Sequence, residues 1–232
     1  MGPLCAALID PENYSAASAA NLAKTTQRAG ASLIMVGGST IGDQSYLDSV
    51  VTRIKRNVTI PVILFPGNIT GVSRHADAIL FSCLLNSTNP YFIIGAQALG
   101  AIHVHRSRLE AIPMGYLVFG SGSTTGFIGQ VNGVPLDRPN LAVMYALAAG
   151  FLGMRTLYLE AGSGASRSIP PNVIRAVRKH YQGLLVVGGG IATPERAREA
   201  ARAGADIIVV GNLLGRKGFE SILKKIAVSI RK

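Results

Sequence analysis

The sequence has few of the residues that build disulfide or zinc frameworks. Only Cys5 and Cys83 are present among its 232 residues, and both lie in apolar runs typical of strands. The spacings CxxC and HxxxH do not occur, which argues against a zinc site. We therefore expect no disulfide, and this cysteine usage favours a reducing, cytoplasmic environment.

Long hydrophobic runs are also missing. Although 48% of the residues are apolar, no stretch reaches the roughly 18 uninterrupted apolar residues that a membrane-spanning helix needs. The first residues show no basic segment followed by a long apolar run, so we expect no signal peptide. The apolar fraction is nevertheless large enough for a sizeable core.

Acidic residues are scarce relative to basic ones, and the formal net charge is +11. Residues 116–232 carry fifteen of the 23 Lys and Arg residues but only six of the 12 Asp and Glu residues. Such a basic half suits an anionic partner, either phosphate or an acidic membrane surface, or it is a solvated face that keeps the protein soluble. We expect no nucleic acid partner, because no basic stripe interleaved with aromatic residues is present.

Short apolar runs of strand length recur along the chain. They are continuous rather than alternating, which is typical of strands buried on both faces of a parallel sheet. Eight strands are predicted: Leu4–Ile9, Ser32–Val36, Pro61–Phe65, Ala78–Ser82, Gly115–Phe119, Arg155–Leu159, Leu184–Val187 and Asp206–Val210.

Helical patterns separate most of these runs. Seven helices are predicted: Ser15–Ala29, Gln44–Asn57, Asn89–His105, Pro139–Leu152, Pro171–Tyr181, Pro194–Ala203 and Gly218–Ile230. Eight strand–helix units in a chain of this length favour an α/β (β/α)₈ barrel, one domain over residues 1–232, with a doubly wound sheet as the alternative. Only Pro66–Ala76 separates the third and fourth strands, so we expect a loop or short extended segment there in place of the third helix.

Three glycine-rich segments follow the last three predicted strands. They are Glu160–Ala165, Gly188–Ala192 and Gly211-Asn212. Glycines let backbone N–H groups approach an anion closely, and the loops after strands seven and eight of such barrels commonly bind phosphate. Any one of these loops is better explained as a tight turn, but the three together favour a phosphate site.

Polar residues at other strand ends suggest what faces this phosphate site. Asp10 ends the first strand and Ser39 follows the second, and a carboxylate with a hydroxyl oxygen suits Mg²⁺. The spacing leaves open whether Asp10 binds metal or caps the Asp-Pro turn. Glu160 either orients and deprotonates a substrate hydroxyl or forms a structural ion pair. Tyr158 is either a core residue or a phosphate ligand.

Several motifs, taken in order, resemble one known family. The chain is similar to the geranylgeranylglyceryl phosphate synthases over nearly its whole length, and to the larger, mainly archaeal branch rather than the bacterial heptaprenyl branch. The motifs are Leu8-Ile9-Asp10-Pro11, Met35-Val36-Gly37-Gly38-Ser39, Pro61-Val62-Ile63-Leu64-Phe65-Pro66, Leu84-Leu85-Asn86-Ser87, Tyr158-Leu159-Glu160-Ala161-Gly162-Ser163-Gly164 and Val187-Gly188-Gly189-Gly190-Ile191.

The resemblance implies a modified TIM barrel whose third helix is replaced. It implies a prenyltransferase that joins the C3 hydroxyl of sn-glycerol 1-phosphate to geranylgeranyl diphosphate, releasing diphosphate. Glu160 matches the carboxylate that activates the glycerol hydroxyl, and Asp10 and Ser39 match the Mg²⁺ positions. The glycerol-phosphate positions are matched by Tyr158, Leu159, Glu160, Ala161, Gly162, Ser163, Gly164, Gly189, Gly190, Gly211 and Asn212.

Further expectations concern partners and the prenyl tail. The resemblance alone implies a homo-oligomer, and the basic second half leads to the hypothesis of a peripheral membrane contact. The segment Asn89–Leu99 carries Tyr91 and Phe92 together with small residues, which fit either an apolar groove for the tail or core packing. Many relatives have Glu-Pro after the fifth strand, where this chain has Gly120-Ser121.

Two other functions remain open. Besides a prenyltransferase, the chain could be another phosphate-binding barrel enzyme, such as an isomerase or aldolase. The second alternative is a homologue that binds phosphate or lipid without turnover. The first alternative calls for a catalytic Lys or second acid at a strand end, and the sequence places none well. The replacement at Gly120-Ser121 is what keeps the second alternative in view.

Overall fold

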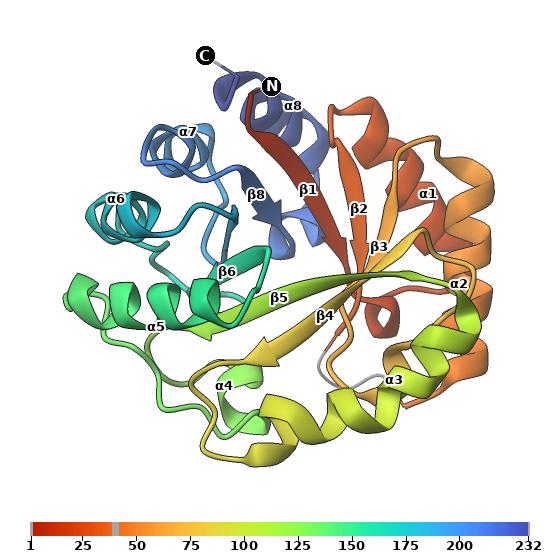
Figure 1. Ribbon diagram of the computed structural model, residues 1–232. Coiled ribbons are helices and arrows are strands. Elements are labelled where there is room, and N and C mark those ends of the chain that lie inside the picture. The colour runs from red at the N-terminus through yellow and green to blue at the C-terminus, as the bar shows by residue number, and fades with distance from the viewer. Residues whose placement is uncertain (1, 39–41, 232) are drawn as a thin grey trace.

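Eight parallel strands close into one barrel in the computed structural model, which describes residues 2–38 and 42–231 (Figure 1). Each strand pairs with its neighbours in sequence, and β8 pairs with β1. The predicted barrel is therefore confirmed. The strands are β1 (Leu4–Ile9), β2 (Leu33–Val36), β3 (Val62–Leu64), β4 (Ala78–Leu84), β5 (Glu110–Val118), β6 (Thr156–Glu160), β7 (Leu184–Gly188) and β8 (Ile207–Val210).

Helices cover the outside of the barrel in every unit except the third. They are α1 (Ala16–Arg28), α2 (Gln44–Asn57), α3 (Ala96–Ser107), α4 (Thr124–Ile128), α5 (Pro139–Phe151), α6 (Pro171–His180), α7 (Pro194–Arg202) and α8 (Phe219–Ser229). Between β3 and β4 only a 3₁₀ turn forms, Ile69–Gly71, so the third helix is replaced as predicted. Nowhere in the described part of the chain is a helix long and apolar enough to span a membrane.

Local sequence explains where the helices begin. The Asp43 carboxylate accepts hydrogen bonds from the N–H groups of Ser45 and Tyr46 and so caps the start of α2. In α7, Thr193 caps and Pro194 occupies the first turn, where its missing N–H is not needed. These caps place each helix just after the loop that leaves the carboxyl end of a strand.

Three elements differ from the sequence prediction. β5 begins at Glu110 rather than Gly115, because it pairs with β4 along the whole length of that strand. The helix expected from Asn89 begins instead with a π-helical turn, Tyr91–Gly95, which continues into α3. After β5, where the sequence predicted no helix before Pro139, the chain forms the short helix α4.

The apolar residues form two packed layers. Inside the barrel lie inward-facing residues such as Met114, Tyr158 and Val186. Between the strands and the helices lies the larger cluster, which includes Leu157 and Leu159. Side chains alternate along β6, so Tyr158 faces the interior while its two neighbours face the helices.

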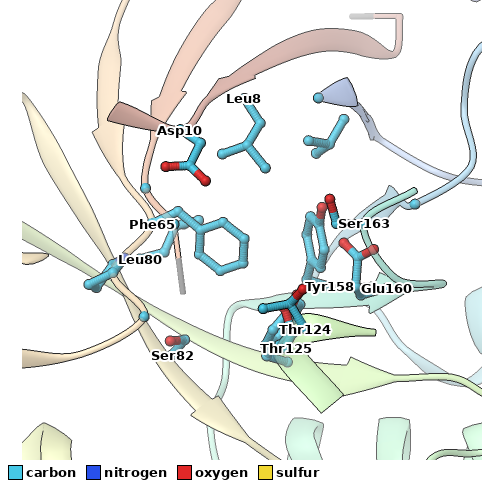
Figure 2. Close-up of a pocket in the computed structure, with 18 of the residues that line it drawn as sticks. Leu8, Asp10, Phe65, Leu80, Ser82, Thr124, Thr125, Tyr158, Glu160 and Ser163 are labelled. Carbon is cyan, nitrogen blue, oxygen red and sulfur yellow. The ribbon is translucent and has the colours of Figure 1, made fainter. Parts of the chain in front are cut away.

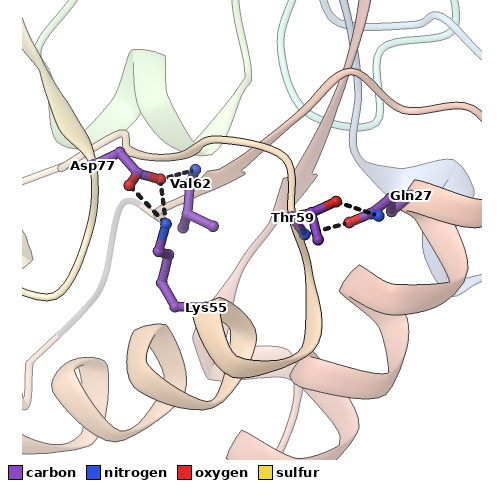
Figure 3. A network of polar contacts seen from close by, with 5 residues as sticks. All are labelled: Gln27, Lys55, Thr59, Val62 and Asp77. Carbon is purple, nitrogen blue, oxygen red and sulfur yellow. Dashed lines mark hydrogen bonds and ion pairs between the residues drawn. The ribbon is translucent and has the colours of Figure 1, made fainter.

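Polar contacts tie the units together at the amino-terminal end of the barrel (Figure 3). The Asp77 carboxylate accepts from the Lys55 ammonium at 2.6 Å and from the Val62 N–H at 2.7 Å. Gln27 and Thr59 exchange two hydrogen bonds of 2.9 Å. These contacts fix α1, α2 and the start of β3 far from the carboxyl ends of the strands.

Candidate active site

A cavity of about 890 Å³ opens at the carboxyl ends of the strands. Its walls come from the loops after β1, β2, β3, β6, β7 and β8 and from helices α3 and α4. Figure 2 shows Asp10 on one side of this space and Tyr158 and Glu160 on the other, with Phe65 between them. The barrel thus gathers residues as far apart in the sequence as Leu8 and Arg216 into one site.

The three glycine-rich loops meet on one side of the cavity. Ser163 Oγ lies 2.9 Å from Asn212 Oδ1, which joins the loop after β6 to the loop after β8. A Cβ placed on Gly189 would come within 2.7 Å of the Ala161 nitrogen, so the loop after β7 lies directly against the loop after β6. Gly189 also has a φ of +79°, in the left-handed region that favours glycine.

Backbone N–H groups in all three loops are available to a ligand. Among the described residues, the N–H groups of Gly189, Gly190 and Asn212 have no protein acceptor. In contrast, Ala161 donates its N–H to the Gly188 carbonyl, and Gly162 donates to the Glu160 carboxylate. By the same criterion the N–H groups of Ser163 and Gly164 have no acceptor among the described residues, so all three loops can offer amides to an anion, and the loops after β7 and β8 supply Gly189, Gly190 and Asn212.

Arg196 of α7 supports the loop after β7. Its guanidinium donates to the Gly190 carbonyl at 2.8 Å. Because C=O and N–H point in opposite directions across a trans peptide, the next N–H, that of Ile191, points away from α7. Arg196 is partly buried and pairs with no carboxylate in the described part of the chain, so its positive charge adds to the anion-binding character of this loop.

Glu160 ends β6 with its side chain turned into the barrel, where only 6% of the residue is exposed. Burial raises the pKa of its carboxyl, against the opposing effect of hydrogen bonds from the Tyr158 hydroxyl and the Gly162 N–H. Burial also raises the pKa of Tyr158 well above its ordinary value, so this hydroxyl stays protonated and donates to the carboxylate. Gly188 leaves the space that the Tyr158 hydroxyl fills.

Asp10 lies on the other side of the cavity, directly after β1. Its Oδ1 accepts the Glu12 N–H at 3.1 Å and so caps a 3₁₀ turn, Pro11–Asn13. Burial raises the pKa of the Asp10 carboxyl. A Cβ on Gly38 would come within 2.6 Å of Oδ1, so the end of β2 lies against this carboxylate. Both of the roles suggested by the sequence, cap and cation ligand, are compatible with this position.

Not all of the remaining predicted site residues line the cavity. Ser163, Gly164, Gly190 and Gly211 line the cavity. The Leu159 side chain instead lies in the core between the strands and the helices. Its backbone is paired within the sheet, so Leu159 supports the site without reaching it. Ser39 lies outside the described residues.

Among the residues of the cavity wall that the sequence analysis missed, four lie near the predicted site residues. They are Phe65 after β3, Tyr116 in β5, and Thr124 and Thr125 in α4. The two threonines follow a Gly/Ser segment that comes directly after a strand, so their place in a loop at a strand end was visible in the sequence. Gly120 lies outside the cavity wall, where its N–H donates to the Val134 carbonyl.

The fold is a (β/α)₈ barrel, and the loops after its last strands offer unpaired amides at the position where such barrels commonly bind phosphate. The chain belongs to the PcrB family, whose profile matches residues 5–230. A geranylgeranylglyceryl phosphate synthase of Cenarchaeum symbiosum is 54% identical over 97% of this chain and 91% of the relative. A geranylgeranylglyceryl phosphate synthase of Nitrosopumilus maritimus is 49% identical over 97% of this chain and 90% of the relative.

Solved structures show the same relationship. The (S)-3-O-geranylgeranylglyceryl phosphate synthase of Thermoplasma acidophilum, in complex with its substrate sn-glycerol-1-phosphate, superposes with a TM-score of 0.96. It is 40% identical, and the match covers 99% of this chain and 94% of that one. A thiamine phosphate pyrophosphorylase of Pyrococcus furiosus, at 12% identity and a TM-score of 0.64, shares the fold alone.

Proposed function

We propose that this protein transfers a geranylgeranyl group from geranylgeranyl diphosphate to the C3 hydroxyl of sn-glycerol 1-phosphate, releasing diphosphate. One observation carries the proposal: a single cavity contains unpaired loop amides, a buried Glu and an Asp, and it continues into an apolar arm. The curated relatives carry the name of this enzyme, and the Thermoplasma acidophilum relative binds sn-glycerol-1-phosphate.

The phosphate of the glycerol substrate binds the loops after β7 and β8. Backbone N–H groups of Gly189, Gly190 and Asn212 donate to its oxygens, and the Arg196 charge lies behind them. This leaves the glycerol carbons pointing toward β6. The C3 hydroxyl then reaches Glu160, the only carboxylate of the described cavity wall on this side.

Glu160 orients the hydroxyl and accepts its proton as the new C–O bond forms. A base must be ionised at working pH, and a raised pKa brings its proton affinity closer to neutral pH, where general base catalysis is most efficient. Tyr158 fixes the carboxylate through its hydroxyl, so the accepting oxygen is held in place before substrate binds.

Asp10 is the residue that would hold Mg²⁺. Within the described residues, no group of three or more His, Cys, Asp or Glu side chains is arranged around a metal position. A hard cation that keeps its waters and takes its other ligands from a substrate phosphate fits a single carboxylate of this kind. Bound there, Mg²⁺ would supply neutralisation of the leaving diphosphate.

The apolar arm of the cavity accommodates the prenyl tail. The arm runs between β4 and α3, where the sequence suggested that Asn89–Leu99 lines a groove. Burial of the tail contributes about 0.8 kcal/mol per CH₂. The apolar lining of the arm is Val72, Ile79, Leu80, Phe81, Phe92, Ala96, Gly100 and Val104, and the polar residues Ser82 and Gln97 of β4 and α3 also belong to the cavity wall. Of the groove residues that the sequence suggested, Phe92 and Ala96 are in the described cavity wall, whereas Tyr91 and Gly95 are not.

We propose that the protein forms a homo-oligomer through a surface on α5. This helix has no charged residue, and its outer face exposes Leu141, Met144 and Phe151, the last of them 85% exposed. A contiguous apolar face of this kind marks an interaction site. Light scattering coupled to size exclusion should give a multiple of the 24.3 kDa chain mass, and a monomer would contradict the proposal.

Peripheral membrane contact is proposed through the basic second half of the chain. A net charge of +11 attracts an anionic surface, and this attraction is screened over about 10 Å at 0.1 M salt. Co-sedimentation with anionic vesicles should therefore fall as salt rises. Binding that does not respond to salt would contradict an electrostatic contact.

A product assay tests the transferase activity. Purified protein is incubated with Mg²⁺, labelled sn-glycerol 1-phosphate and a series of prenyl diphosphates. We expect an ether product with the C20 donor. Glycerol phosphate binding without product would contradict the transferase and indicate a binding protein. An aldolase that forms a Schiff base is disfavoured, because no Lys is present among the described residues of the cavity wall.

A further inference from the structure

Three aromatic rings pack against one another in the wall of the site. Phe65 follows β3, and Tyr116 and Tyr158 are paired residues of β5 and β6. The ring centroids are 5.2 Å apart for Phe65 and Tyr116, 5.4 Å for Phe65 and Tyr158, and 5.1 Å for the two tyrosines. Each ring therefore contacts the other two. We call these three residues the aromatic floor.

The aromatic floor lies between the two carboxylates of the site. All three rings line the cavity and also pack on the core inside the barrel. In Figure 2 the Phe65 ring lies between Asp10 and Tyr158, and Glu160 lies beyond Tyr158. If diphosphate leaves on the Asp10 side and glycerol attacks from the Glu160 side, the carbon that changes partners passes over these rings.

The charges around the aromatic floor favour a cation above it. Among the described residues of the cavity wall, the acids are Asp10 and Glu160, and the one Lys or Arg is Arg216. Arg216 follows the 3₁₀ turn after β8, beside the phosphate loops. The space beside the rings is thus bordered by negative charge and chiefly by the half-buried Phe65 ring, because Tyr116 and Tyr158 are only 8% and 1% exposed. Aromatic rings attract cations.

We infer that the aromatic floor stabilises positive charge on the allylic carbon of the prenyl donor, an inference that rests on the transferase function proposed above. In this step the bond between C1 and the diphosphate oxygen breaks, and its electron pair leaves with the diphosphate. The glycerol C3 oxygen forms the new bond to C1, and its proton passes to the Glu160 carboxylate. C1 carries partial positive charge between these two events.

Phe65 is the ring that isolates this effect. Tyr158 donates its hydroxyl to Glu160, and the Tyr116 hydroxyl shares a hydrogen bond with Thr125, so replacing either tyrosine also removes a polar contact. Phe65 has no such group. Its backbone N–H donates to the Val36 carbonyl, and its ring packs against the rings of Tyr116 and Tyr158.

The test compares Phe65→Leu, Phe65→Tyr and fluorinated phenylalanines at position 65. Single-turnover rates and KM values for both substrates are measured in the intact protein. We expect Phe65→Leu to lower the single-turnover rate about 30-fold, which corresponds to about 2 kcal/mol, with KM values changed less than about threefold. Phe65→Tyr should keep most of the rate, and the rate should fall stepwise as fluorines withdraw charge from the ring.

Phe219→Leu is the matched control, because Phe219 contacts the outer core and lies outside the described cavity wall. It should leave the single-turnover rate unchanged. If fluorination has no effect although Phe65→Leu is slow, the ring acts by packing and the inference is overturned. If wild-type protein makes no prenylated product at all, the proposed transferase function is refuted, and the role inferred for the aromatic floor is refuted with it.

Discussion

Glu160 is the residue on which the proposed chemistry depends. Replacing it by Gln removes the base while keeping the size and the interior position of the side chain. We expect Glu160→Gln to lower kcat by at least about 100-fold, while the far-UV circular dichroism spectrum stays unchanged. Near-normal turnover in this variant would refute the role assigned to the carboxylate.

The raised pKa of Glu160 also predicts how stability depends on pH. A buried carboxyl holds its proton above the ordinary value of 4.5, while the unfolded chain has already released it. Stability should therefore fall as pH rises from about 4.5 toward the folded-state pKa. Chemical denaturation should show Glu160→Gln to be more stable than wild type at neutral pH, and the difference should vanish in acid. A constant difference at all pH values would contradict the raised pKa.

The same residue predicts the pH profile of the reaction. The base works only when ionised, so the single-turnover rate should rise with pH through the raised folded pKa. The acid limb should therefore lie above the range of an ordinary Glu. An acid limb at or below pH 4.5 would show that Glu160 is not the group that limits the rate.

Gly188 is required by its contact with Tyr158. A Cβ at this position would overlap the Tyr158 hydroxyl, and Tyr158 is held by its aromatic neighbours. Gly188→Ala should lower the free energy of unfolding by about 1–3 kcal/mol, as is typical of overpacking. Gly100→Ala is the control: a Cβ there meets no atom within 4 Å, so it should not destabilise.

Residue-level predictions from the sequence succeeded where position along a strand decides the outcome. Asp10, Glu160 and the glycines follow predicted strand ends, and parallel strands bring their ends to one face of the barrel. Phe65 and Tyr116 were missed because they read as ordinary apolar strand residues. Nothing local in the sequence tells which side of a strand faces the cavity.

At the scale of elements, α3 is expected to set the length of the apolar arm. Gly100 lies in the arm, and a Cβ on it points into open space. Gly100→Phe should fill this space and shift the ratio of kcat/KM values toward C10 or C15 donors by about tenfold or more. Ile102→Phe is the control on the same helix, because Ile102 is 58% exposed. An unchanged ratio in Gly100→Phe would mean that the tail does not bind along α3.

Element types were predictable from the sequence, but some boundaries were not. The run Glu110–Met114 contains charge and Pro113 and so lacks a strand pattern, yet pairing with β4 makes it part of β5. The five residues of α4 are Gly- and Thr-rich, and their capping by Ser123 is visible only once the loop is folded. Tertiary contacts decide both cases.

At the scale of the whole molecule, the candidate active site lies at the carboxyl end of the barrel, and polar contacts that stabilise the fold lie at the amino-terminal end. At the amino-terminal end, Asp206 repeats the arrangement of Asp77: it accepts from the Leu185 N–H at 2.8 Å and pairs with Arg178 at 2.9 Å. Each Asp precedes a strand and binds the first part of the strand before it. The two contacts lie four units apart and brace opposite sides of the barrel.

Because the Asp77 side chain is 42% exposed, we expect its ion pair with Lys55 to contribute little. The hydrogen bond to the Val62 N–H should matter more. Asp77→Ala should lower the free energy of unfolding by about 1–2 kcal/mol, and Lys55→Met by about 0.5 kcal/mol or less. Equal losses in the two variants, measured by urea denaturation, would show that the ion pair dominates.

A crystal structure with sn-glycerol 1-phosphate is the most direct test of the site. The phosphate should lie about 3 Å from the N–H groups of Gly189, Gly190 and Asn212, and the C3 hydroxyl should point at the Glu160 carboxylate. A phosphate bound away from the loops after β7 and β8, or a C3 hydroxyl turned away from Glu160, would contradict the account.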